Sequence, residues 1–350
     1  MDRKVSRLKS LAQSVFAALA FLLVIAAAGS ADFLEQRRKF RDEIRNKVET
    51  GLDSDGNYIS VIFKGEEGKY NFGVTAEDRA RLKAYASSYF NTTDDKLLDK
   101  IVDEMNTGHY AVYKEYHDDG VNLKVLFLSP KAKYWEWLTD VNGIEKMFHT
   151  YNFSVGLHAP DKDSMYVILQ TEGAFFGISQ AVTLPLIFTT DHEKRTLSFK
   201  MPAQKEINQA MADMEPVKEG RTSPEDKFID AARTHPFFQQ KDGGEYAVSD
   251  KDILELYSET IKNMDEECPV KESTGHWTVQ DDYPYLVVDY SLKTRVNIDA
   301  FIPPSLRFLS GTLEDIAQSI SDEVSVKYLP LSMKNLRDFT QEWTRTGGPN

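Results

Sequence analysis

The chain has 350 residues, of which 41% are hydrophobic and 28% charged, a composition typical of a globular protein. Asp and Glu outnumber Lys and Arg by 55 to 42, and the net charge is −13. A chain this acidic, with no basic run in its folded part, is not expected to bind nucleic acid. The single cysteine, Cys268, excludes an internal disulfide framework and zinc sites that require two or four cysteines.

The N-terminal residues have the parts of a secretory signal peptide in the usual order. Four basic residues are followed by the apolar run Val15–Ala28, and Gly29 and Ala31 occupy the −3 and −1 positions of a cleavage site. The apolar run is shorter than the about 20 residues that span a bilayer. We therefore expect a cleaved signal over residues 1–31 and an exported protein, periplasmic or secreted. An uncleaved signal that anchors the chain to a membrane is the alternative.

Residues 32–107 are expected to form a mostly helical N-terminal extension. A strand is predicted at Tyr58–Phe63, and helices are predicted to begin after Thr75 and at Asp94. Asn91 and Asn152 start glycosylation sequons, which would matter only in a eukaryotic host.

From Gly108 the hydrophobic period changes to that of strands. Tyr110 to Phe127 reads as a hairpin with its turn at 118–120, and Ser129 with Pro130 is expected to begin a helix through Trp135 and Leu138. Further strands are predicted at Met165–Thr171, Ile178–Leu184 and Thr196–Met201.

Residues 203–272 interrupt this β pattern and are interpreted as a helical insertion of three helices. The pattern resumes at Gly275, and Leu286–Ile298 alternates apolar and polar residues as a strand with one buried face does. Ile302-Pro303-Pro304-Ser305 then introduces a long amphipathic helix, whose apolar stripe continues to Val324. A short helix is predicted at Leu331 to Trp343, in a C-terminal tail over 327–350.

Four stretches resemble motifs of the START-like (SRPBCC) superfamily, particularly its polyketide-cyclase and coenzyme-Q-binding branches. They are Val121–Leu128 running into Ser129-Pro130, the run Trp135-Glu136-Trp137-Leu138-Thr139-Asp140, the run Gly275-His276-Trp277-Thr278-Val279, and Tyr290–Ile298 followed by Ile302-Pro303-Pro304-Ser305-Leu306. The resemblance covers about 108–202 and 273–326. The large insertion and the N-terminal extension depart from the family's core.

The resemblance implies an α+β helix-grip fold, in which an antiparallel sheet wraps around the long C-terminal helix. It places the START-like domain at 108–326. It also implies a cavity between sheet and helix that binds or carries an apolar small molecule such as a lipid, isoprenoid or sterol. The candidate cavity residues are Trp135, Phe175, Phe176, Phe199, Trp277, Val288, Tyr290, Leu292, Arg295, Leu309 and Leu313.

Three of these candidates carry more specific expectations. Arg295 is predicted to face outward, and would anchor an anionic head group only if the strand turned it inward. One residue of the pair Phe175 and Phe176 is a candidate for the lip of the cavity or for transient contact with a membrane surface.

No catalytic residue or cofactor is predicted, since the sequence has no phosphate-binding loop, dinucleotide fingerprint or nucleophile elbow. No metal site is predicted either, because His117 and His192, which lie beside acidic residues, fall in predicted turns where solvated side chains are expected. Two other functions stay open. One is a cyclase or hydrolase that uses the same cavity, with Tyr290 or an inward histidine as acid/base. The other is a non-catalytic interaction module with a filled core, whose insertion docks a protein partner.

Overall fold

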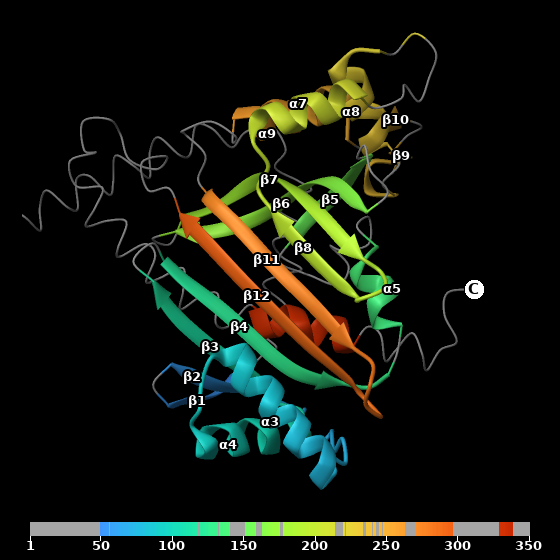
Figure 1. The fold of residues 1–350 in the computed structure, drawn as a ribbon. Helices are drawn as coiled ribbons and strands as arrows, with labels where there is room; N and C mark the ends of the chain where they lie inside the picture. Colours follow the sequence, from blue (N-terminus) through green and yellow to red (C-terminus); the bar gives the residue numbers. More distant parts are fainter. Residues whose placement is uncertain are drawn as a thin grey trace, which may run out of the picture.

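The computed structural model describes residues 50–140, 151–158, 163–213, 220–262, 270–296 and 329–338, apart from gaps of one or two residues at 56, 118–119, 132, 176–177, 221, 234–235, 240, 243–244 and 247. Within them, ten strands form one sheet in the order β1-β2-β3-β4-β12-β11-β8-β7-β6-β5 (Figure 1). The strands are β1 Thr50–Asp55, β2 Tyr58–Phe63, β3 Tyr110–His117, β4 Gly120–Ser129, β5 Tyr151–His158, β6 Ser164–Phe175, β7 Ile178–Asp191, β8 Thr196–Lys200, β11 Val270–Gln280 and β12 Leu286–Val296.

Every neighbouring pair in this sheet is antiparallel. Strands β5 to β8 are neighbours in the order of the sequence, and β11 and β12 come next in the sheet. Strand β12 then pairs with β4, from Leu286 opposite Ser129 to Lys293 opposite Asn122. The predicted α+β class with an antiparallel sheet is confirmed. The long C-terminal helix expected after Ile302 lies outside the described residues.

Helices cover the outer face of the sheet at its two ends (Figure 1). At one end, α3 (Ala76–Phe90) and α4 (Asp95–Asn106) pack on β3, β4 and β12 through a cluster that includes Leu126 and Val287. At the other end, α7 (Gln204–Asp213), α8 (Pro224–Ala232) and α9 (Asp250–Lys262) pack on β6 and β7. The predicted helices of the insertion are thus confirmed. The insertion also contains a separate two-stranded sheet, β9 (Lys241–Asp242) with β10 (Glu245–Tyr246), and the 3-10 turn Pro236–Gln239.

Local capping explains where several of these helices begin. Thr75, Asp94 and Ser223 each accept a hydrogen bond from a backbone N–H in the first turn of the helix that follows. No helix among the described residues is long and apolar enough to span a bilayer.

The inner face holds the main hydrophobic core. Apolar side chains of eight strands, β2, β3, β4, β6, β7, β8, β11 and β12, converge there with Tyr134 and Leu138 of α5 (Tyr134–Leu138) and with residues of the helix at 329–338. The predicted helix start at Ser129-Pro130 is wrong. Ser129 is the buried last residue of β4, paired with Leu286, so α5 begins only at Tyr134 and is preceded by Lys133, which makes no side-chain cap.

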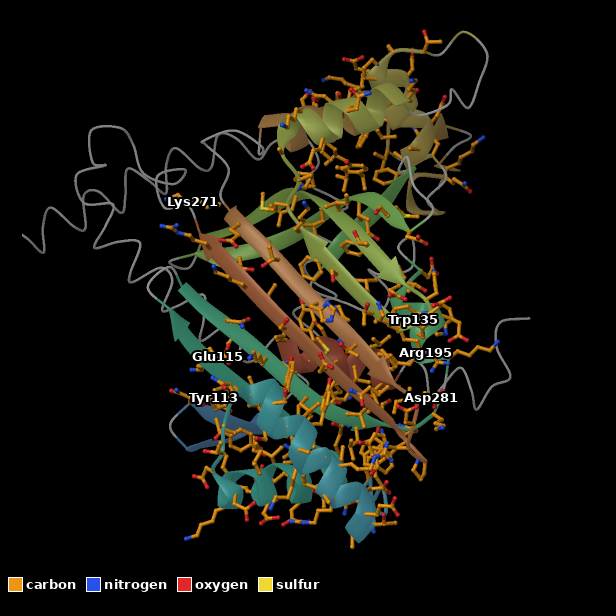
Figure 2. The ribbon with its side chains drawn as sticks, viewed as in Figure 1. Tyr113, Glu115, Trp135, Arg195, Lys271 and Asp281 are labelled. Carbon is orange, nitrogen blue, oxygen red and sulfur yellow. The ribbon has the colours of Figure 1, made fainter. Side chains whose placement is uncertain are left out.

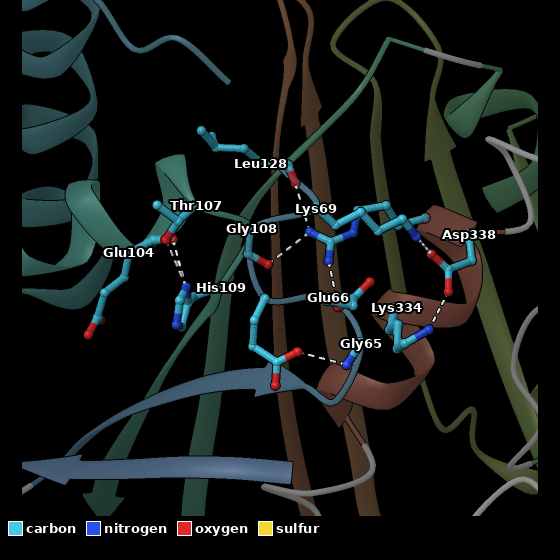
Figure 3. A network of polar contacts seen from close by, with 12 residues as sticks. Gly65, Glu66, Lys69, Glu104, Thr107, Gly108, His109, Leu128, Lys334 and Asp338 are labelled. Atoms are coloured by element: carbon cyan, nitrogen blue, oxygen red, sulfur yellow. Dashed lines mark hydrogen bonds and ion pairs between the residues drawn. The ribbon is translucent and has the colours of Figure 1, made fainter. Parts of the chain in front are cut away.

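A buried ion pair connects the helix at 329–338 to the loop after β2 (Figure 3). Arg337, which is 0% exposed, donates from Nη2 to Oε2 of Glu66 at 2.9 Å and from Nη1 to the carbonyl oxygens of Gly108 at 3.1 Å and Leu128 at 3.4 Å. Its guanidinium also lies 4.2 Å from the centre of the Tyr70 ring. Desolvated charges of this kind are tolerated because they are paired and hydrogen-bonded.

Gly275 occupies an inner-face position of β11 where the ring of Phe199 fills the space that a side chain would take. A Cβ atom at this position would overlap the Phe199 ring and lie 2.9 Å from the carbonyl oxygen of Ser291. The glycine in the Gly-His-Trp run is therefore a packing requirement of the inner face.

We expect Gly275→Ala to lower the free energy of unfolding by about 2–3 kcal/mol, because the added methyl group overpacks the core. Urea unfolding followed by circular dichroism measures this loss. Thr274→Ala, one position earlier on the other face, is the control and should change stability by less than about 0.5 kcal/mol. The overlap predicts that Phe199→Leu recovers part of the loss in Gly275→Ala, so strictly additive effects would contradict this explanation.

Candidate functional site

The centre of the inner face is built from aromatic and aliphatic side chains of β8, β11 and β12. Trp277 and Tyr290 are paired across the two strands, and their ring centres are 4.2 Å apart. Phe199 of β8 stacks on Tyr290 with 6.3 Å between ring centres, and all three side chains are buried. Val288, fully buried, and Leu292, partly buried, extend the same row along β12. We call these five residues the inner apolar site.

Trp135 is partly exposed and lies beside the turn that connects β7 and β8 (Figure 2). Its indole N–H donates to Nδ1 of the exposed His192 at 3.3 Å, and the two rings meet edge to face. Asp281, the first residue of the loop between β11 and β12, forms ion pairs with Arg195 of the same turn at 2.8 Å and with Lys131 at 2.7 Å. Trp135 therefore connects the core to a charged and accessible rim, a position unlike that of the buried site residues.

Arg295 belongs to the outer face, as predicted. It follows Asp289 and Lys293 at alternate positions of β12, lies opposite Glu272 of β11, and is half-buried. Phe175 is the last residue of β6, and nothing is described of its side chain. Phe176, Leu309 and Leu313 lie outside the described residues. Six of the candidates, Trp135 and the inner apolar site, thus contribute to one core cluster.

Polar side chains on the outer face form a hydrogen-bonded chain that the sequence did not predict. Ser198 Oγ lies 2.8 Å from His276 Nδ1, and His276 Nε2 lies 3.2 Å from Thr278 Oγ1. Thr278 and Tyr85 of α3 both hydrogen-bond the carboxyl group of Asp289, which is 2% exposed. Five side chains from β8, β11, β12 and α3 are therefore linked across the sheet.

Burial sets the protonation of this outer polar chain. It lowers the pKa of His276, so the imidazole is neutral at neutral pH. It raises the pKa of Asp289 to about 6, although the hydrogen bonds from Tyr85 and Thr278 act in the opposite direction. A carboxyl group in this state can give up or take a proton near neutrality.

A serine beside a neutral histidine invites comparison with a nucleophile and its base. Acyl transfer also needs N–H donors for the developing oxyanion, and the backbone around Ser198 and His276 is taken up by strand pairing on both sides. His276 points to the outer face, so it is not the inward histidine of the enzyme alternative. Within the described ranges, no three His, Cys, Asp or Glu side chains are grouped so that they could hold a metal ion.

No protein-family model matches this sequence, and the search of curated proteins finds no match. The structure is similar to an aromatase/cyclase from a Streptomyces species, with 12% identity over 65% of this chain and 98% of that one and a TM-score of 0.38. A STAR-related lipid transfer protein of Xanthomonas axonopodis matches with 11% identity over 60% of this chain and 90% of its fragment, at a TM-score of 0.30. A major latex-like protein of Panax ginseng matches with 9% identity over 63% and 97% of the two chains, at a TM-score of 0.29.

All three matches have identities of 12% or less and TM-scores of 0.38 or less, so they are similarities of structure from which no family or function follows.

The raised pKa of Asp289 predicts that its contribution to stability falls as the pH rises. The folded state keeps this proton up to about pH 6 and the unfolded chain loses it near pH 4, so the contribution is complete below about pH 4 and lost above about pH 6. The full effect is about 3 kcal/mol.

Asp289→Asn removes this titration. We expect the stability difference between the native protein and the variant to shift by about 3 kcal/mol in favour of the variant between about pH 4 and about pH 7. Urea unfolding of both proteins across this range measures it, and Asp282→Asn, an exposed carboxyl on the neighbouring loop, is the control. Parallel pH curves for the native protein and Asp289→Asn would contradict the assignment.

Proposed function

We propose that the protein binds an apolar small molecule, of the lipid, isoprenoid or sterol type, against the inner apolar site. The observation that carries the proposal is the aromatic group of Phe199, Trp277 and Tyr290, held in contact on the inner face by strands that pair across the middle of the sheet. Ligand sites for apolar molecules are lined by such side chains with few polar groups among them. Binding or carriage, without chemistry on the ligand, is the function that this lining supports best.

Two features of the surroundings support the same proposal. The insertion helices α7 to α9 pack on the outer face, so they leave the inner face to α5, the C-terminal segment and the ligand. Trp135, partly exposed beside His192, would form the lip of the proposed cavity on the inner face of the sheet. The same rim is where transient contact with a membrane would take place.

Native mass spectrometry of residues 32–350, followed by organic extraction, tests this proposal directly. We expect one apolar molecule per chain, either carried through purification or acquired from a mixed lipid extract. An apo mass that stays unchanged after incubation with that extract would overturn the proposal and favour the interaction module.

Tryptophan fluorescence places the ligand on the inner face. Ligand addition should shift the emission of the native protein, because Trp277 lies in the proposed site, and the shift should be mostly lost in Trp277→Phe. Trp137→Phe, a second tryptophan packed at the margin of the same core, is the matched control and should retain the shift.

We also propose that the protein is exported after cleavage behind Ala31. This rests on the order of basic, apolar and small residues in 1–31. N-terminal sequencing of the protein from the exported fraction of an expressing culture should begin at Asp32, and replacing Gly29 and Ala31 by leucine should block processing. A full-length chain in the soluble cytoplasmic fraction would contradict the proposal, and one in the membrane fraction would favour the anchor.

A further inference from the structure

Three buried polar atoms near Arg337 have no hydrogen-bond partner among the described residues. They are the hydroxyl groups of Tyr110 and Tyr134 and Oε1 of Glu66, and the three side chains are no more than 2% exposed. Such atoms are rare in native proteins, because burial removes their hydrogen bonds to water without replacing them. Each one therefore requires an explanation.

Arg337 brings these groups to one part of the core. It is paired with Glu66 through the other carboxylate oxygen, and its guanidinium lies 4.4 Å from the centre of the Tyr110 ring. Tyr134 belongs to the same cluster and is connected to Tyr110 through Phe127, whose ring lies between theirs in the series of ring contacts. The three atoms come from the loop after β2, from β3 and from α5, elements that meet only in the folded chain.

The polar group adjoins the inner apolar site. The rings of Tyr110 and Phe127 have centres 5.1 Å apart, and those of Phe127 and Tyr134 are 6.4 Å apart. Both tyrosines belong to the same continuous cluster as Trp277 and Tyr290. A molecule lying on the apolar face could therefore place a polar end among these three atoms.

The chemistry of the three atoms selects that polar end. Burial raises the pKa of Tyr110 and Tyr134, so both phenols stay protonated and can donate a hydrogen bond. Glu66 Oε1 can only accept one, and the charge of Glu66 is already balanced by Arg337. A hydroxyl group satisfies both needs, since it accepts from a phenol and donates to the carboxylate. A ligand carboxylate would add an unbalanced charge beside Glu66, and a hydrocarbon end would leave all three atoms unpaired.

We propose that Tyr110, Tyr134 and Glu66 bind the hydroxyl group of an apolar alcohol whose hydrocarbon part lies on the inner apolar site. This inference rests on the proposed function and adds to it the class of the ligand.

The test compares three probes of equal chain length, tetradecanol, tetradecanoic acid and tetradecane, by native mass spectrometry and competition with a bound fluorescent lipid. The variants are Tyr110→Phe, Tyr134→Phe and the double variant, each of which removes a hydroxyl group with no described partner and leaves the ion pair of Arg337 in place. Tyr285→Phe is the matched control, because its hydroxyl is also buried without a described partner but belongs to the cluster under α3 and α4. Urea midpoints verify that every variant is folded.

We expect the native protein to bind tetradecanol more tightly than tetradecane or the ionised acid. Each tyrosine substitution should weaken tetradecanol binding by about fivefold, the value of one net hydrogen bond, without changing the affinity for tetradecane. Tyr285→Phe should change neither affinity.

Other outcomes separate this inference from the proposed function. Equal binding of alcohol and alkane, unaffected by either tyrosine substitution, would overturn the inference while leaving the apolar site intact, and the three atoms would then hold an ordered water only. Tighter binding of the acid would also overturn it. If none of the probes or extracted lipids binds, the proposed function fails and the inference fails with it.

Discussion

The pairing of β4 with β12 is the constraint on which the rest of the structure depends. It joins strands from distant parts of the sequence and forms the seam between the two parts of the sheet, β1 to β4 on one side and β12, β11, β8, β7, β6 and β5 on the other. Because both faces of β12 are covered near its start, Val288 fits the inner core while Val287 fits the cluster under α3 and α4. A shift of one residue in this register would exchange the two faces and expose both cores at once.

The seam also separates two kinds of chemistry. On the inner side the β12 side chains from Leu286 to Leu292 belong to the hydrophobic core, so interactions there are mainly dispersion and desolvation. Polar groups lie at its margins, around Arg337 and where Thr294 lies opposite Ser273. On the outer side, Asp289 lies under Tyr85 and is connected through Thr278 to the half-buried His276. One strand with alternating residues thus has an apolar inner face and a polar outer face, on which burial raises the pKa of Asp289 to about 6.

Signals that act over a few residues were sufficient to predict much of this fold. The alternation over Leu286–Ile298 predicted that Val288, Tyr290 and Leu292 share a buried face, and capping residues such as Thr75 and Ser223 located helix starts. The same signal failed at Ser129, because its pairing with Leu286 extends β4 through a sequence that would otherwise cap a helix. Tertiary pairing overrode local propensity there.

The sites that depend on contacts across the chain could not be predicted in this way. Glu66 and Arg337 lie near opposite ends of the sequence, and neither stands in a motif. Ser198 and His276 become neighbours only through the β8–β11 register. Trp135 was predicted as a cavity residue from a motif, but its bond to His192 required the two elements to meet at the end of the sheet.

The bond between Arg337 and Glu66 has a consequence for the order in which the molecule is assembled. A ribosome makes Arg337 271 residues after Glu66, so the cation that balances the buried Glu66 carboxylate is synthesised much later than the carboxylate itself. Strand β12, which pairs with β4 and so joins the two parts of the sheet, is likewise synthesised only after the insertion. Neither the pairing of β4 with β12 nor the buried ion pair can form before β12 and Arg337 have been synthesised. Loss of the helix at 329–338 would therefore leave the Glu66 carboxylate without the cation that balances it in the core.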